Sequence, residues 1–223
     1  MKNRFLHYLL SGLAIAAVVS CGKDPVPMDD SDQYPNCYYF QAEIEGFQKK
    51  HIETRNAYTS VQTGSCFDEV TPDTTIHYMT FKAGFYQDAE DFTTSCREQL
   101  YVQFKNMHLD IVEMNMDPDS LFHNKFSTGD RNYFQLTNNV DSIASEGIEI
   151  IWVDKLGKTW STKWETQEGS TFSITEDRQF IGALGEKKHE IKATFNCTLY
   201  DDEKTSLMCE EGIIFVDFQK TCN

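Results

Sequence analysis

The feature that most constrains this chain is an alternation of apolar and polar side chains, which recurs from residue 38 to residue 217. Successive side chains of a β-strand point to opposite faces, so this period of two predicts strands with one buried face. The alternating segments are 38–44, 76–81, 100–104, 148–152, 172–174, 191–197 and 213–217. Turn residues separate many of them, and no long segment has a helical period. The pattern predicts an all-β domain, a single antiparallel β-sandwich, with a small lipocalin-like β-barrel as the alternative.

The one helical signal lies at residues 117–122. Asp117 is a candidate N-cap, and Pro118 occupies the first helical position, where its fixed φ is favourable. Because the segment is short, we expect a single turn.

One hairpin turn can be predicted in detail from residues 154–158, Asp-Lys-Leu-Gly-Lys. Asp at the first position and Gly at the fourth favour a type I turn followed by a left-handed glycine. The resulting register pairs Trp152 with Trp160, Ile150 with Thr162, and Ile148 with Trp164. All three tryptophans then share one face with isoleucines. This favours a core wall over the alternative, a stacking platform for sugar rings.

The N-terminal residues have the pattern of an export signal. Lys2 and Arg4 precede an apolar stretch of eleven residues, which is too short to span a bilayer because a spanning helix needs ~20. Residues 18–21, Val-Val-Ser-Cys, resemble a lipobox, in which the cysteine thiol receives diacylglycerol before cleavage. We therefore predict a lipoprotein signal peptide at 1–20, a lipidated Cys21 with a flexible tether at 21–36, and a β domain at 37–223.

The predicted tether contains three of the five prolines of the chain and four aspartates. Such a composition cannot bury enough surface to offset chain entropy. Gly22 follows the cysteine, and the absence of Asp at this position resembles outer-membrane lipoproteins. Residues 22–24 with the later pair Asp29-Asp30 resemble an acidic signal for export to the cell exterior, and a solvated spacer is the alternative. We expect an outer-membrane lipoprotein of the cell envelope, with surface exposure as the further expectation.

The charge balance excludes two classes of partner. The chain has 20 basic and 35 acidic residues, and loss of Lys2 and Arg4 leaves 18 against 35, a net charge of −17. Nucleic-acid binders carry basic patches, and anionic headgroups attract basic segments. We therefore expect no nucleic acid and membrane contact only through the lipid. The oligomeric state stays open.

Six cysteines remain after Cys21 is set aside, and an even number in an exported chain favours disulfides. Strands flanking the polar loop 201–206 would place Cys197 opposite Cys209. We pair the remaining four as Cys66 with Cys96, both expected in Ser/Thr-rich loops, and Cys37 with Cys222, which bracket the domain. Buried free thiols are the alternative.

A search for catalytic motifs finds no His-Glu-x-x-His, Gly-x-Ser-x-Gly, Cys-x-x-Cys or phosphate-binding glycine loop. We accordingly assign no catalytic residue, metal or cofactor. The pattern favours a non-catalytic binding or structural module for a glycan or protein ligand, with loops 54–67 and 86–97 as the candidate binding face. The alternative is an envelope-anchored hydrolase whose carboxylates the sequence does not locate.

Three Asp-Ser/Thr-apolar or similar triplets resemble acceptors for O-glycans in exported Bacteroidota proteins. They place candidate acceptor hydroxyls on Thr74, Ser120 and Ser142. A glycan there would be bulky and surface-exposed.

Several features together resemble one family. They are the lipobox, the Pro/Asp tether, Gly157 with Trp160 in a hairpin, and the run Lys-Ala-Thr-Phe-Asn-Cys-Thr-Leu-Tyr at 192–200 before a strand that contains Gly212. These are similar to uncharacterised Bacteroidota-type outer-membrane lipoproteins with a C-terminal β-sandwich domain. The resemblance implies location and fold but no activity.

The lipobox generates the first prediction. Cys21→Ala removes the thiol that accepts the lipid, so the protein should leave the detergent phase in a phase-partitioning experiment and remain unprocessed or mislocalised. Detergent partitioning equal to that of the wild type would contradict the assignment.

Overall fold

The computed structural model describes residues 37–53, 58–70, 75–87, 98–108, 118–136 and 145–219. These residues belong to one compact unit, Tyr34–Asn223. Its elements are β1 (Tyr39–Ile44), β2 (Phe47–Ile52), β3 (Tyr58–Val70), β4 (Thr75–Gln87), β5 (Gln99–His108), α2 (Pro118–Lys125), β6 (Gly129–Asp130), β7 (Gly147–Val153), β8 (Thr159–Ser161), η1 (Thr162–Trp164), β9 (Thr171–Ile181), β10 (Lys187–Tyr200) and β11 (Ser206–Gln219).

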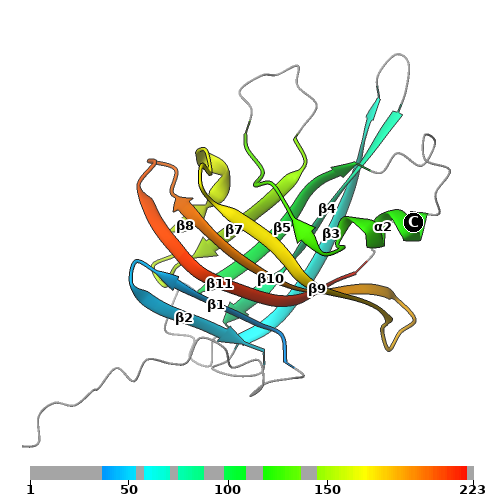
Figure 1. Cartoon of the computed structure of the whole chain (residues 1–223), viewed down its shortest axis with the longest axis horizontal. Coiled ribbons are helices and arrows are strands. Elements are labelled where there is room, and N and C mark those ends of the chain that lie inside the picture. The colour runs from blue at the N-terminus through cyan, green and yellow to red at the C-terminus, as the bar shows by residue number, and fades with distance from the viewer. Residues whose placement is uncertain are drawn as a thin grey trace, which may run out of the picture. The chain divides into compact units, whose positions relative to one another are not determined.

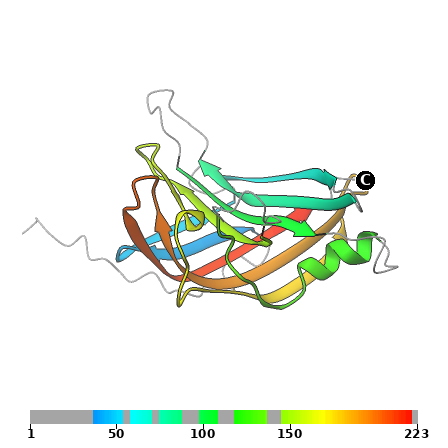
Figure 2. The same cartoon turned by 90° about the horizontal axis from the view of Figure 1, so that it is seen from above.

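The strands form a single antiparallel sheet in the order β2-β1-β11-β10-β8-β7-β5-β4-β3, and β9 pairs with β10 off this path. The sheet curls into a half-barrel, so that β3 and β4 lie across the core from β10 and β11 (Figures 1 and 2). The prediction of an all-β antiparallel domain is confirmed. A sheet that curls on itself buries one face of most of its strands, which is why the alternation recurs along the chain.

One edge of β10 is shared by two strands. β9 pairs with residues 187–196, whereas β8 joins through the single pair Tyr200–Ser161. The segment after β6 bridges the gap between β9 and β7, because the Arg131 amide donates to the Phe172 carbonyl and Tyr133 pairs with Ile148. Gly147 permits this approach, since a Cβ there would lie 2.5 Å from the Phe134 nitrogen.

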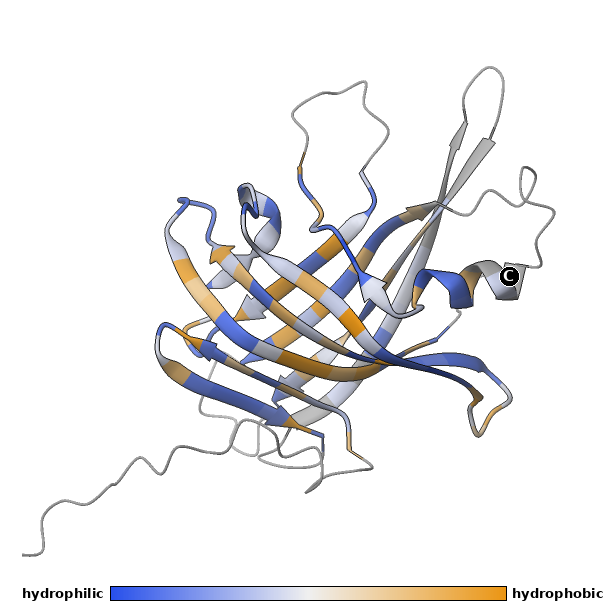
Figure 3. Cartoon of the chain, in the orientation of Figure 1, coloured by the Kyte–Doolittle hydropathy of each residue, from blue (hydrophilic) through white to orange (hydrophobic). Residues whose placement is uncertain are grey.

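The core consists of the inward side chains of the curled sheet. In β10 the buried positions are the odd-numbered residues from 189 to 199, and Figure 3 shows the matching alternation of apolar and polar bands along the long strands. Aromatic rings dominate the centre: Phe126 stacks on Phe218 with ring centroids 4.7 Å apart, and Phe104 lies 4.8 Å from Phe126. Large rings bury much apolar area for each ordered residue.

The helical segment is longer than the single turn that the sequence predicts. α2 has eight residues, and it places Phe122 and, one residue beyond the helix, Phe126 in the core. Their rings lie 5.1 Å apart, and both contact Phe81 of β4. Tertiary packing of these rings sustains a helix that the sequence pattern alone marks only at its start.

The predicted hairpin turn is confirmed. Gly157 has φ +81°, its amide donates to the Asp154 carbonyl, and Trp152 pairs with Trp160. The expectation for the third tryptophan is wrong. β8 ends at Ser161, and the chain turns into η1, which leaves Trp164 38% exposed, whereas Trp152 and Trp160 are each 7% exposed.

Three strands were not predicted, namely β2, β3 and the two-residue β6. The segment proposed as a binding loop at 54–67 forms part of β3 from Tyr58 onward, and residues 54–57 lie outside the described residues. β3 has 13 residues, and its many Thr, Ser and Gln side chains hide the alternation. β2 is an edge strand with the polar sequence Phe-Gln-Lys-Lys-His-Ile. Lysines suit an edge because they oppose pairing with another chain.

The aromatic core generates a stability prediction. Phe126→Ala removes a fully buried ring and should lower the free energy of unfolding by about 3–5 kcal/mol, because a cavity remains at the site. Urea unfolding followed by circular dichroism measures the loss. Phe47→Ala is the matched control, since Phe47 is 61% exposed and its removal should cost about 0.5 kcal/mol or less. Equal losses in the two variants would contradict the central role of Phe126.

Candidate functional site

A groove of about 640 Å³ lies on the outer face of β9, β10 and β11. We call it the aromatic groove, and its lining residues are Tyr38, Glu176, Asp177, Arg178, Phe180, Glu190, Lys192 and Phe215. Each of the three rings is partly exposed. Partly exposed rings beside charged groups give a surface that offers both apolar contact and hydrogen bonds.

Strand register builds the floor of the groove in three adjacent rows. In one row Lys192 of β10 pairs with Phe215 of β11 and with Glu176 of β9. In the next row Glu190 pairs with Asp217 and with Arg178. In the third row Lys188 pairs with Gln219 and with Phe180. Because residues two apart on a strand point to the same face, the three rows present their side chains together.

Ion pairs hold the polar side chains of the groove in place. The Arg178 guanidinium lies 2.9 Å from Glu190 Oε1 and stacks over the Phe180 ring at 5.5 Å from its centroid. Lys192 Nζ lies 3.6 Å from Glu176 Oε1. Exposed pairs such as these contribute little to stability, so their donors and acceptors can be given to a ligand at low cost.

Tyr38 forms the wall of the groove beside β11. Its hydroxyl donates to Glu190 Oε2 at 3.4 Å, and its ring centroid lies 5.3 Å from that of Phe215. Burial, together with the negative charges of Asp217 and Glu190, raises the pKa of Tyr38. The phenol therefore stays protonated and remains a hydrogen-bond donor.

Asp217 lies next to the groove but is only 1% exposed. Burial raises the pKa of its carboxyl, and Lys188, whose Nζ lies 2.9 Å from Asp217 Oδ2, opposes that shift. Gln62 of β3 also donates to this carboxylate. These contacts fasten β3 to β10 and β11, so the carboxyl serves the fold.

A pair of histidines lies behind Asp177. His189 Nε2 is 3.3 Å from Asp177 Oδ1, and His189 Nδ1 is 2.9 Å from His123 Nδ1 on α2. Burial, and then the neighbouring His123, lowers the pKa of His189 to about 4, although Asp177 opposes the shift. Asp177 also accepts from the Thr128 amide, so it joins the groove to the segment after α2.

A second buried polar cluster surrounds Glu98 at the start of β5. Glu98 Oε1 accepts from Trp152 Nε1 at 3.1 Å and from Lys49 Nζ at 3.3 Å. His51 Nε2 lies 3.9 Å away, and burial lowers the pKa of His51 to about 4. Because His51, Glu98 and Trp152 are all buried, this cluster ties β2 to β5 and β7 and offers no open surface.

The cysteine register is confirmed where it can be followed. Cys197 pairs with Cys209 across β10 and β11, and both carry free thiols in this structure. Cys37 also carries a free thiol, and Cys66 pairs with Met79 in β3 rather than lying in a loop. Cys96 and Cys222 lie outside the described residues. All three disulfides stay predictions.

The other predicted positions are less informative. Ser120 is exposed on α2, whereas Cys21, Thr74, Ser142 and residues 88–97 lie outside the described residues. Within the described ranges, no group of three or more His, Cys, Asp or Glu side chains could hold a metal ion. No described helix is long and apolar enough to cross a membrane.

Sequence reasoning missed the aromatic groove because its residues come from three strands and from Tyr38, which precedes β1. The available signal was the outward position of Phe215 and Phe180, where an alternating strand normally places polar residues. No family model, curated protein or solved structure matches the chain.

The two buried histidines generate a pH prediction. An unfolded histidine has a pKa of about 6.5, whereas His51 and His189 have folded pKa values of about 4. Between these values the unfolded chain binds more protons, so the free energy of unfolding should rise with pH. Each histidine should contribute at most about 1.4 kcal/mol per pH unit.

Urea unfolding of the wild type and of His189→Gln between pH 4 and pH 7 measures this effect. The variant should show a shallower slope over that range, and His51→Gln should act in the same way independently. Asp217 contributes the opposite slope just above its unfolded pKa, so the informative quantity is the difference between variant and wild type. Parallel curves for all three proteins would refute the assignment.

Proposed function

We propose that this protein is a lipid-anchored binding module of the cell envelope that holds a glycan in the aromatic groove. The observation that carries the proposal is the gathering of Tyr38, Phe180 and Phe215 beside ion-paired charges in one groove of about 640 Å³. A flat apolar ring face matches the C–H face of a sugar, whereas charged side chains match its hydroxyl groups.

The charges of the groove favour a neutral polar ligand. Glu176, Asp177 and Glu190 face Arg178 and Lys192, so acceptors and donors alternate across the floor. Sugar hydroxyls both donate and accept, and they can use both kinds of group. A strongly anionic or cationic ligand would meet like charges on at least one side.

The anchor belongs to the same proposal. Lipid on Cys21 would hold the chain at the outer membrane, and residues 21–36 would let the domain reach ligands at the cell surface. Tethering raises the local concentration of a binding site.

An envelope-anchored hydrolase is the second candidate, because Asp217 has a raised pKa and lies in register with Glu190. Glycoside hydrolysis requires two carboxyl groups that flank the bond to be cleaved. Asp217 is almost fully buried and is held by Lys188 and Gln62, so substrate would not reach it. This favours binding over hydrolysis.

A glycan array probed with the mature polypeptide, residues 21–223 made without lipid, tests the proposal. Phe180→Ala should weaken binding of the best glycan at least about tenfold, a loss of about 1.4 kcal/mol, because the stacking face is removed. Phe47→Ala is the matched control. The exposed Phe47 ring lies at the turn of the β1–β2 hairpin, at the opposite end of β1 from Tyr38, so the substitution should leave binding unchanged.

Two results would overturn this function. The first is the absence of any glycan whose binding depends on Phe180. The second is turnover of a glycan that is lost in Glu190→Gln or Asp217→Asn, which would establish the hydrolase.

A further inference from the structure

A second surface, on the outer face of β4, β5 and β7 and on η1, has a charge opposite to that of the chain. The chain has a net charge of −15. The outward side chains of β4, β5, β7 and β8 that the structure describes include one carboxylate, Glu149. Three lysines surround it, namely Lys82, Lys105 and Lys163, and we call this set the lysine cluster. Three positive charges against one negative charge leave a local charge of +2.

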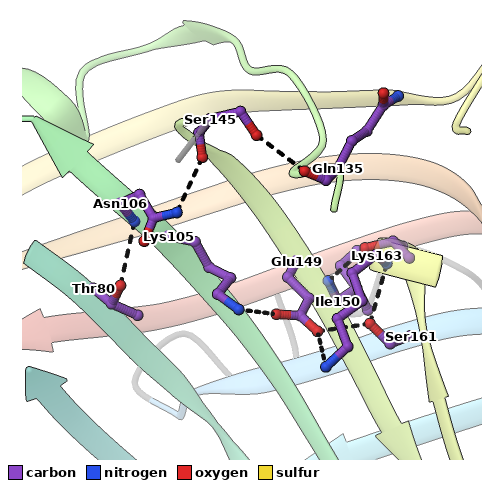
Figure 4. Close-up of polar contacts among 10 residues, drawn as sticks. Thr80, Lys105, Asn106, Gln135, Ser145, Glu149, Ile150, Ser161 and Lys163 are labelled. Carbon is purple, nitrogen blue, oxygen red and sulfur yellow. Dashed lines mark hydrogen bonds and ion pairs between the residues drawn. The ribbon is translucent and has the colours of Figure 1, made fainter. Parts of the chain in front are cut away.

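Glu149 forms ion pairs with two lysines of the cluster. It is 1% exposed, and its Oε2 lies 3.1 Å from Lys105 Nζ while its Oε1 lies 3.4 Å from Lys163 Nζ. Ser161 Oγ donates to Glu149 Oε1 at 2.7 Å, and Figure 4 shows these groups converging from β5, β7, β8 and η1. The carboxylate is thus satisfied from the protein side, whereas both lysines are about one-quarter exposed.

Lys82 differs from these two lysines, because it forms no ion pair with any carboxylate that the structure describes. It lies in the same row as Glu149, because Lys82 pairs with Gln103 and Gln103 pairs with Glu149. Within the described part of the chain, no carboxylate lies within ion-pair distance of Lys82. Its Nζ is 3.4 Å from the centroid of the Tyr101 ring. Burial lowers the pKa of Lys82, which is the direction expected for a partly desolvated cation without a direct counterion.

Aromatic rings frame the other two lysines. Lys105 Nζ lies 4.5 Å from the Phe134 ring centroid, and Lys163 Nζ lies 4.6 Å from that of Trp164. The segment that carries Phe134 is held against β5, because Asn106 Nδ2 donates to the Ser145 carbonyl and Ser145 Oγ donates to the Gln135 carbonyl (Figure 4). The cations are therefore positioned by rings and by the sheet before any ligand arrives.

We propose that the lysine cluster is a binding site for an acidic sugar, with its carboxylate or sulfate group between Lys82 and Lys105. The partly exposed Trp164 ring beside Lys163 supplies the apolar face for the sugar ring. Lys105 and Lys163 converge on Glu149, and Lys82 lies in the same row of the sheet, so the cluster is compact and suits one or two anionic groups. The large negative charge of the whole chain disfavours a long polyanion such as nucleic acid. This site uses other strands than the aromatic groove and stands without it.

The test uses the mature polypeptide and four probes: digalacturonate, galactose, inorganic sulfate and the oligonucleotide dT8. Fluorescence reports binding, because Trp164 is partly exposed whereas Trp152 and Trp160 are buried and give a constant background. Digalacturonate should bind, with an affinity that falls as salt rises, and galactose should not. Tighter binding of dT8, or equal binding of sulfate, would overturn the acidic-sugar assignment.

Variants test the residues. Lys82→Gln should weaken digalacturonate binding about tenfold, Lys82→Arg should largely retain it, and Lys155→Gln at the exposed tip of the β7–β8 turn is the control for loss of one charge. Glu149→Gln keeps the side-chain shape and removes the competing carboxylate, so it should tighten binding several-fold. Weaker binding in a folded Glu149→Gln protein, or equal losses in Lys82→Gln and Lys155→Gln, would refute the site. Circular dichroism of each variant establishes that it is folded.

Discussion

The packing of Phe122 and Phe126 against the inside of the curled sheet is the interaction on which the rest of the structure depends. These rings join β4, β5 and β11 through contacts with Phe81, Phe104 and Phe218. A half-barrel that lacked them would expose the inner faces of its strands to water. The helix that carries them also positions His123 against His189, and the segment that follows it bridges β9 to β7.

The inner face of the sheet is filled by the core, so both candidate binding surfaces lie on the outer face. The aromatic groove on β9, β10 and β11 contains charges of both signs, whereas the lysine cluster on β4, β5 and β7 is locally positive. Each surface presents partly exposed rings beside fixed charges. Such rings keep apolar area in contact with water, which is unfavourable. Apolar ring faces beside a few placed polar groups are the usual composition of a ligand site, which is why we assign ligands to both surfaces.

Buried polar groups fasten the parts of the sheet that backbone pairing does not join. Glu98 links β2 to β5 and β7, and Asp217 links β3 to β10 and β11. Such groups are costly when unpaired, so each specifies which strands must meet. The same burial keeps His51 and His189 neutral, and it makes the stability of the domain sensitive to acid.

The sequence by itself determined the features that depend on residues close together in the chain, namely strands and hairpin registers. Alternation identified most of the long strands, and the turns at 154–158 and 201–206 set the registers that place Trp152 opposite Trp160 and Cys197 opposite Cys209. The composition of β3 concealed a strand, because its many polar side chains weaken the alternation. Only the tertiary structure decided that α2 has eight residues and that Trp164 leaves the core. It alone placed Tyr38 and Phe180 in one groove, and Lys82 in the same row as Glu149, because pairing joins strands that lie far apart in sequence.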